Sequence, residues 1–124
     1  MKTMSREIKF RAWIKPTKKM NEGNFALGAN GCIYFDDLDF LGPKMFELMQ
    51  YTGLLDKNKK KIYEGDIGTD INDEKYEVRF ADGCFEIIHD GNVIEPLSEV
   101  ATDMEIIGNI YENPTLLNEG DGRV

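Results

Sequence analysis

The stretch that decides the fold runs from Leu48 to Gly68 and reads LMQYTGLLDKNKKKIYEGDIG. It contains two short β-prone runs, Met49 to Leu55 and Ile62 to Ile67, on either side of a polar turn at Asp56 to Lys61. A second tight turn is expected at Glu64-Gly65-Asp66. Apolar runs bounded by polar and glycine-containing segments are typical of strands. The stretch therefore predicts a strand, a turn, a second strand and a second turn.

Strands are also predicted on the N-terminal side of this stretch. Ile8, Phe10 and Ala12 occur at every second position, which predicts a strand with one buried face. Trp13 falls on the opposite face, where an aromatic side chain is more often covered by a neighbouring element or a partner chain than left exposed.

A hairpin is predicted around Asn30-Gly31, because this dipeptide readily supplies the positive φ angles of a type I′ turn. Its strands would be Phe25 to Leu27 and Cys32 to Phe35. The segment Lys44 to Gln50 is compatible with a helical turn or with a strand that continues into the central stretch. We favour the strand.

The C-terminal half continues the strand pattern. Tyr76 to Phe80 and Cys84 to Ile88 flank an Asp-Gly turn at Ala81 to Gly83 and form the clearest hairpin in the chain. Val93-Ile94 is a further short strand that Pro96 restricts to an edge or an end. A final strand is expected within residues 104–111.

The fold class that follows is all-β with minor helix. Five short strands in the second half predict a small closed or nearly closed barrel of SH3-like type. We expect an N-terminal β-hairpin subdomain, 1–47, packed on this barrel, 48–112. A single helical turn is expected within Leu97 to Asp103. The polar C-terminal tail, 113–124, is expected to be mobile from Thr115 onward.

Three parts of the sequence carry a family resemblance. QYTGL, DKN and IYEGDI in the central stretch resemble the central motif of the YopX-type proteins of phages and prophages. REIKFRAW, from Arg6 to Trp13, is similar to the opening of that family, and IIGNIYENPTLL, from Ile106 to Leu117, to its closing segment. The resemblance covers almost the whole chain. It implies a fold and a phage or prophage origin, and it implies no particular biochemical activity.

One position departs from the family pattern. The turn after Asn58 usually carries Gly in the family, and Lys59 stands there in this chain. Because a lysine tolerates positive φ poorly, we expect either that Lys59 avoids it or that Asn58 takes the left-handed conformation instead.

The net charge of −8 is unevenly distributed along the chain. Residues 1–61 hold 12 Lys and Arg against 7 Asp and Glu, a balance of +5. Residues 62–124 hold 3 against 16, a balance of −13. Such polarity favours head-to-tail contact between copies or a basic face opposite an acidic one, and it is equally compatible with a solvated surface that maintains solubility.

The composition predicts a cytoplasmic protein, located in the bacterial host cytoplasm if the family resemblance holds. No apolar run approaches the ~18 residues that a membrane span needs, and the N-terminus lacks the pattern of a signal peptide. Cys32 and Cys84 are isolated, so we expect two reduced, partly buried thiols and no disulfide.

No residue pattern predicts an enzyme, a cofactor or a metal centre. His89 is the only histidine, and with two cysteines it falls short of a zinc ligand set. Cys84 precedes it by five positions, which places the two side chains on opposite faces of a strand. Glycine-rich phosphate-binding motifs are absent. The acidic group Asp36, Asp37 and Asp39 lacks the spacing of a calcium loop and reads as solvated.

Paired carboxylates at Glu64 and Asp66 have a catalytic and a structural interpretation. Such a pair can divide acid and base roles when its two pKa values differ. We favour the structural one, in which Asp66 accepts a backbone hydrogen bond that fixes the turn.

The predicted function is a non-catalytic phage or prophage accessory protein that acts as a protein-interaction or self-assembling module. Its expected partners are further copies of the chain or a host or phage protein. One alternative is nucleic-acid binding through Lys57 to Lys61 with Lys15, Lys18 and Lys19, and another is an acidic mimic that inhibits a host nucleic-acid-binding protein. The candidate interaction surface comprises Trp13, Tyr51, Lys57, Lys59, Lys60, Lys61, Tyr63, Glu64 and Asp66.

Overall fold

Strand β6, Phe46–Leu55, carries the first half of the central stretch and is the longest of the strands. Its first half pairs antiparallel with β1, Phe10–Ile14, and its second half pairs antiparallel with β7, Lys61–Tyr63. The strand predicted between residues 44 and 50 is therefore confirmed from Phe46 onward. Lys44 lies instead in a 3₁₀ turn, Pro43–Met45, because Pro43 fixes the start of that turn.

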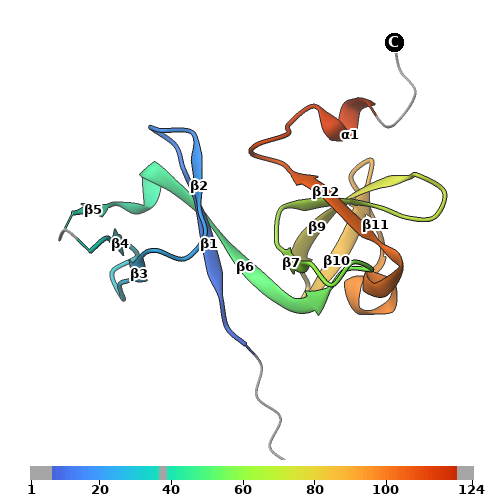
Figure 1. The fold of residues 1–124 in the computed structure, drawn as a ribbon, viewed down its shortest axis with the longest axis horizontal. Coiled ribbons are helices and arrows are strands. Elements are labelled where there is room, and N and C mark those ends of the chain that lie inside the picture. The colour runs from blue at the N-terminus through green and yellow to red at the C-terminus, as the bar shows by residue number, and fades with distance from the viewer. Residues whose placement is uncertain (1–6, 37–38, 120–124) are drawn as a thin grey trace, which may run out of the picture. The chain divides into compact units, whose positions relative to one another are not determined.

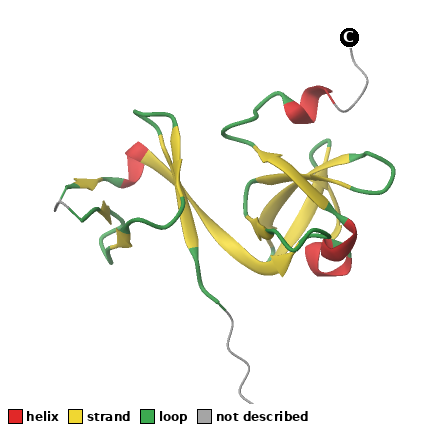
Figure 2. Ribbon diagram, in the orientation of Figure 1, coloured by secondary structure: helices red, strands yellow, loops and turns green. Residues whose placement is uncertain are grey.

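The computed structural model describes residues 7–36 and 39–119. They form an N-terminal unit, residues 8–50, and a C-terminal unit, residues 51–119 together with Glu7. Strands account for most of the regular structure in both units (Figures 1 and 2). The all-β class with minor helix is confirmed.

The N-terminal unit contains two small antiparallel sheets. β1 lies between β6 and β2, Lys19–Asn21. The second sheet has the order β3, β4, β5, formed by Ala26–Leu27, Ile33–Tyr34 and Phe40–Leu41. The buried residues of this unit's core are Ala12, Ile14, Ile33 and Phe46, and Phe25, Phe35, Leu41 and Leu48 pack against them.

The buried face predicted for β1 is only partly correct. Ala12 is fully buried, but Ile8 precedes the strand and is 64% exposed. Arg11, which the alternation assigned to the polar face, is buried and its Nε donates to Met49 Sδ at 3.4 Å. Side chains on both faces of β1 are therefore covered, at least in part. Trp13 on that face is half-buried.

The hairpin around Asn30-Gly31 forms, but its turn is not of type I′. β3 and β4 pair with Leu27 opposite Ile33, and Gly31 has φ of 87° while Asn30 is not in the positive-φ region. The Asn30 side chain instead accepts the Cys32 N–H at 3.1 Å. The loop spans residues 28–32 and is closed by the bond from the Gly28 N–H to the Cys32 carbonyl at 2.9 Å, so it is longer than a two-residue turn.

The C-terminal unit is built on a five-stranded antiparallel sheet with the order β11, β10, β9, β8, β12. It curls around a hydrophobic core, in agreement with the predicted SH3-like barrel (Figure 1). The core comprises Ile62, Val78, Ile87, Leu97, Ala101, Met104 and Ile106. The strands are β8, Asp66–Thr69; β9, Lys75–Ala81; β10, Cys84–His89; β11, Asn92–Pro96; and β12, Glu105–Asn109.

Two-residue turns join the last three strands of the meander, and the first of them is the Asp-Gly turn predicted from the sequence. Asp82 and Gly83 have φ of 52° and 86°, and Asp90 and Gly91 have φ of 51° and 79°. Positive φ at both central residues is the signature of type I′ turns. β11 is an edge strand that ends at Pro96, as the proline required.

The segments outside the sheet differ from the sequence prediction in two places. The single helical turn expected within Leu97 to Asp103 is two 3₁₀ turns, Leu97–Glu99 and Ala101–Asp103. The segment expected to be mobile from Thr115 onward contains a short helix, α1, Leu116–Glu119. Leu116 and Leu117 are half-buried there. Residues 120–124 lie outside the described residues.

Candidate interaction sites

The turn between β6 and β7 is organised by one buried carboxylate. Asp56 is 4% exposed, and its Oδ1 accepts the N–H groups of Asn58 at 2.8 Å and Lys60 at 2.9 Å. Its Oδ2 accepts the N–H of Ile106 on β12 at 2.9 Å. Burial opposes ionisation of Asp56, but these hydrogen bonds outweigh it and hold the pKa below its ordinary value. One side chain thus fixes the turn and attaches it to the sheet.

Lys59 takes the left-handed conformation that the sequence analysis expected it to avoid. Its φ is 64°, whereas Asn58 is not in the positive-φ region. The prediction that Asn58 would adopt this conformation in its place is therefore wrong. The Asn58 and Lys60 amides are both bound to Asp56, and the Lys59 N–H donates to the Asp56 carbonyl at 2.9 Å. These bonds determine the path of the backbone whatever side chain stands at position 59.

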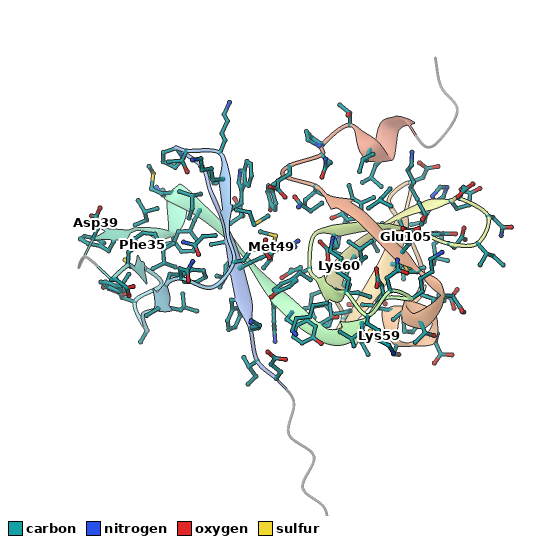
Figure 3. The ribbon with its side chains drawn as sticks, in the orientation of Figure 1. Phe35, Asp39, Met49, Lys59, Lys60 and Glu105 are labelled. Atoms are coloured by element: carbon teal, nitrogen blue, oxygen red, sulfur yellow. The ribbon has the colours of Figure 1, made fainter. Side chains whose placement is uncertain are left out.

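Four lysines project from this turn, which we call the lysine turn: Lys57, Lys59, Lys60 and Lys61. Lys57 Nζ lies 3.7 Å from Glu105 Oε1, and Lys61 Nζ lies 3.7 Å from Glu7 Oε1 and 5.5 Å from the centre of the Tyr51 ring. Lys59 and Lys60 are exposed and have no ion-pair partner within residues 7–36 and 39–119 (Figure 3). Two of the four charges are therefore available to a partner.

The remaining residues of the predicted surface in this unit are mostly buried. Tyr51 and Tyr63 face each other across β6 and β7, are 7% and 6% exposed, and have ring centres 5.7 Å apart. Asp66 is 2% exposed and its Oδ2 accepts the Tyr63 N–H at 2.8 Å, which is the turn-fixing bond that the sequence suggested. Glu64 is half-buried. These four residues serve packing and turn formation.

Trp13 belongs to the N-terminal unit, so the predicted surface is divided between the two units. In the same unit the Asp39 carbonyl accepts the Phe35 N–H at 2.9 Å, and Asp39 Oδ1 accepts the Phe40 N–H at 3.0 Å. Asp37 lies outside the described residues. Within the described part of the chain, no group of three or more His, Cys, Asp or Glu residues has an arrangement that would hold a metal ion.

Cys84 and His89 occupy opposite ends of β10. Five residues of extended chain separate them by roughly 16 Å, a distance too long for a nucleophile and its base. Desolvation and the neighbouring Glu86 and Asp82 carboxylates raise the pKa of the Cys84 thiol, which lowers its reactivity. His89 Nδ1 lies 3.0 Å from the Lys75 carbonyl.

An acidic pocket of about 260 Å³ lies in the C-terminal unit at the end of the barrel core. Its floor is apolar and its rim carries three carboxylates. We call this cavity the acidic pocket, and its lining residues are Asp70, Ile71, Tyr76, Ile87, Glu95, Val100, Asp103 and Met104. The pocket is smaller than the ~300–1,000 Å³ typical of sites for cofactors and drug-sized ligands. Its size suits a single side chain.

The rim carboxylates differ in how they are bound. Asp70 Oδ1 accepts the N–H groups of Asn72 and Glu74 at 2.9 and 3.0 Å, and its Oδ2 accepts the Tyr76 hydroxyl at 2.9 Å. Burial opposes ionisation of Asp70, but these bonds hold its pKa below the ordinary value. Glu95 and Asp103 have no hydrogen bond or ion pair from their side chains within the described residues.

Burial and the surrounding carboxylates both act on the phenol of Tyr76. Burial, the hydrogen bond to Asp70 and the charges of Asp70, Glu74 and Glu95 raise the pKa of Tyr76 to about 12. Burial, the largest of these causes, disfavours any charge, whereas the carboxylate charges favour a cation. The pocket therefore combines an apolar floor with an uncompensated negative rim, which suits the aliphatic stem and the charged head of a lysine or arginine.

Sequence reasoning missed this pocket. Its carboxylates come from the turn after β8, from β11 and from the 3₁₀ turn Ala101–Asp103, which are up to 33 positions apart. The acidic balance of residues 62–124 was the available signal, but it does not say which carboxylates converge. Only the strand order brings them to one place.

No helix of the described chain, residues 7–36 and 39–119, is both long and apolar enough to cross a membrane.

Comparisons with known proteins place the chain in a family. The comparison with curated proteins found no match.

The solved structures supply two similar folds. The crystal structure of protein EF1440 from Enterococcus faecalis matches with a TM-score of 0.67 and 28% identity over 91% of this chain and 99% of that one. The crystal structure of protein yopX from Bacillus subtilis matches with a TM-score of 0.61 and 21% identity over 88% and 97%. The model of the protein family described as YopX protein matches residues 9–118 of this chain. The chain therefore belongs to the YopX family.

Proposed function

We propose that the chain is a non-catalytic protein-interaction module, and that its acidic pocket binds a lysine or arginine side chain of a partner protein. The observation that carries the proposal is the pair of unbound carboxylates, Glu95 and Asp103, above the apolar floor formed by Ile87, Val100 and Met104. A cationic side chain would bury its methylene groups on this floor and place its charge between the carboxylates. We further propose an accessory role in a phage or prophage cycle, in the cytoplasm of the host, which rests on the sequence resemblance to YopX-type proteins.

The electrostatic conditions favour a cation over a neutral ligand. A single exposed ion pair contributes little, about 0.2–1 kcal/mol. In the acidic pocket one cation would meet two carboxylates at once, above an apolar floor. The binding energy would therefore come from the combination of apolar contact and charge, and each alone would be weak.

The test is a titration of the full chain, labelled with ¹⁵N, with a capped Gly-Lys-Lys-Gly peptide and with the same peptide acetylated on both lysines. We expect amide shifts at the pocket residues Ile71, Tyr76, Glu95 and Asp103 with the first peptide and none with the second. Glu95→Gln/Asp103→Asn should weaken binding about tenfold, which corresponds to ~1.4 kcal/mol.

The matched control is Glu22→Gln/Glu99→Gln, which removes two exposed negative charges outside the pocket lining. It should leave the peptide affinity nearly unchanged. Equal shifts with the acetylated peptide, or equal weakening by the control, would contradict the proposal, because either result would mean that general charge and not the pocket attracts the peptide.

A second candidate function is nucleic-acid binding through the lysine turn, favoured by the exposure of Lys59 and Lys60. With two available charges, the affinity for a single strand should fall with a slope of about −1.4 in log affinity against log salt. Fluorescence anisotropy with a labelled oligonucleotide measures this slope. Lys59→Gln/Lys60→Gln should abolish the salt dependence, and a slope that persists in this variant would assign binding to other residues.

A further inference from the structure

We infer that the partner side chain that enters the acidic pocket belongs to a second copy of this chain, supplied by Lys59 or Lys60 of its lysine turn. This inference rests on the proposed function, since it names the occupant of the same pocket. It gives the C-terminal unit two complementary surfaces, a projecting cation on the turn between β6 and β7 and a receiving carboxylate pocket at the five-stranded sheet.

The charges of the two surfaces are complementary. Lys59 and Lys60 have no ion-pair partner in the described chain, and neither do Glu95 and Asp103. Lys60 interacts with the buried Asp56 carboxylate of its own turn through charge alone. The neighbouring Lys57 and Lys61 already lie 3.7 Å from Glu105 and from Glu7 within the copy that carries them. The two lysines that remain are therefore the ones at the exposed tip of the turn.

The lysine turn is organised before any partner binds. Asp56 holds the N–H groups of Asn58, Lys60 and Ile106, so the turn is attached to β12 and cannot move independently of the sheet. Lys59 keeps φ at 64°, a conformation costly for a lysine, because these bonds determine it. Because its backbone is already ordered, the turn loses little backbone entropy on binding. This strengthens a contact that involves only one or two side chains.

Such a contact joins two different patches of the chain, the turn and the pocket. It either closes reciprocally into a two-fold dimer, with each turn in the pocket of the other copy, or continues head-to-tail with one free turn and one free pocket at the ends. In the second case assembly proceeds to a closed ring or to an open chain. The uneven charge along the sequence, +5 in residues 1–61 and −13 in residues 62–124, agrees with this polarity.

The test uses two variants of the full chain that each remove one surface. Lys59→Glu/Lys60→Glu removes the positive charges of the lysine turn and keeps the pocket intact. Glu95→Gln/Asp103→Asn removes two negative charges of the acidic pocket and keeps the lysine turn intact. Sedimentation velocity should show concentration-dependent association of the original chain, and no association of either variant alone. An equimolar mixture of the two should form a dimer and nothing larger, because it contains one intact turn and one intact pocket per pair.

Ionic strength supplies an independent readout. Association of the original chain should weaken about tenfold or more between roughly 0.05 M and 0.5 M salt, since the Debye length falls well below the size of the contact. Association of both variants alone, at unchanged affinity, would overturn the inference. So would a mixture that remains monomeric.

The failure of this inference is distinguishable from the failure of the proposed function. If the original chain stays monomeric but binds the Gly-Lys-Lys-Gly peptide through the pocket, the pocket accepts a different partner and only the second copy is excluded. If the peptide does not bind and the chain still associates head-to-tail in the mixing test, the contact depends on the whole turn and not on an isolated lysine. If neither occurs, both proposals are wrong.

Discussion

Asp56 and Asp70 begin two turns of the same construction. Each carboxylate accepts the N–H groups two and four residues ahead, and each turn has a residue with positive φ at its fourth position, Lys59 in the first and Asp73 in the second. The two turns differ in their remaining bond. Asp56 binds a backbone N–H of Ile106 on β12, whereas Asp70 binds a phenol at the acidic pocket. The first has a structural task and the second shapes the candidate site.

We expect Asp56→Ala to lower the free energy of unfolding by about 3 kcal/mol, because it removes three hydrogen bonds and leaves the Ile106 N–H buried without an acceptor. Urea denaturation measures the change. Asp70→Ala is the matched control, since it loses the same two turn bonds but no buried backbone bond to another strand. Equal losses of unfolding free energy in the two variants would mean that the bond with Ile106 contributes no more to stability than the bond with Tyr76.

The same carboxylate makes stability depend on acid pH. The pKa of Asp56 is lower in the folded chain than its ordinary value of 3.8, so the folded state binds this proton less readily than the unfolded state does. The stabilisation is therefore complete above the unfolded pKa and is lost as the pH falls through the lower folded pKa. Urea midpoints measured below pH 4 should fall less steeply with pH in Asp56→Asn than in the original chain.

Lys59→Gly should stabilise the chain, because glycine adopts φ of 64° without the steric cost that a Cβ imposes. The greater freedom of glycine in the unfolded chain offsets part of this gain, so we expect a net increase of about 0.5 kcal/mol. Lys59→Ala is the control that removes the charge and keeps the Cβ. A urea midpoint for Lys59→Gly no higher than that of Lys59→Ala would show that the conformation carries no strain.

At the scale of elements, hydrogen bonds connect the end of β12 to the residues just before α1. The Asn109 carbonyl accepts the Asn113 N–H at 2.9 Å, and Asn113 Oδ1 accepts the Asn109 N–H at 3.1 Å. Gly108 lies against this joint, and a Cβ there would stand 2.8 Å from Leu116 Cδ1 and closer still to the Asn113 side chain. The absence of a side chain at this position lets α1 approach the strand.

Gly108→Ala should therefore cost about 2 kcal/mol of unfolding free energy, since the added methyl displaces Asn113 and its hydrogen bond. Gly42→Ala is the matched control, because a Cβ at Gly42 meets nothing within 4 Å and its φ of −77° suits any residue. Chemical denaturation compares the two. If both substitutions are equally harmless, the contact with Asn113 and Leu116 is loose.

At the scale of the whole molecule, the chain has two hydrophobic cores and one strand that enters both units. The core around Ile33 belongs to residues 8–50, and the core around Val78 belongs to the C-terminal unit. β6 supplies Phe46 to the first and ends in the second. Separate cores allow separate opening of the two units, and a shared strand limits how independent that opening is.

Ile33→Ala should lower hydrogen-exchange protection in the N-terminal unit by an amount equivalent to about 2–4 kcal/mol, because it opens a cavity at a fully buried site. Amides of β9 and β10 should keep most of their protection, since they belong to the other core. Native-state hydrogen exchange by NMR resolves the two sets. A uniform loss across all strands would show that the chain opens as one cooperative unit.

The sequence by itself determined the elements whose signals are local. The Asp-Gly turns, the central strand and turn, and the edge position of β11 follow from residues a few positions apart, because turn chemistry and side-chain alternation act over that distance. The φ of Lys59 follows from the local bonds to Asp56, which side-chain alternation does not reveal. Tertiary structure alone decided the burial of Arg11 and the bond from the Ile106 N–H to Asp56, since each joins residues far apart in the sequence. The acidic pocket belongs to this second group. Its carboxylates are distant in sequence, and only the pairing order of the curled sheet brings them around one apolar floor.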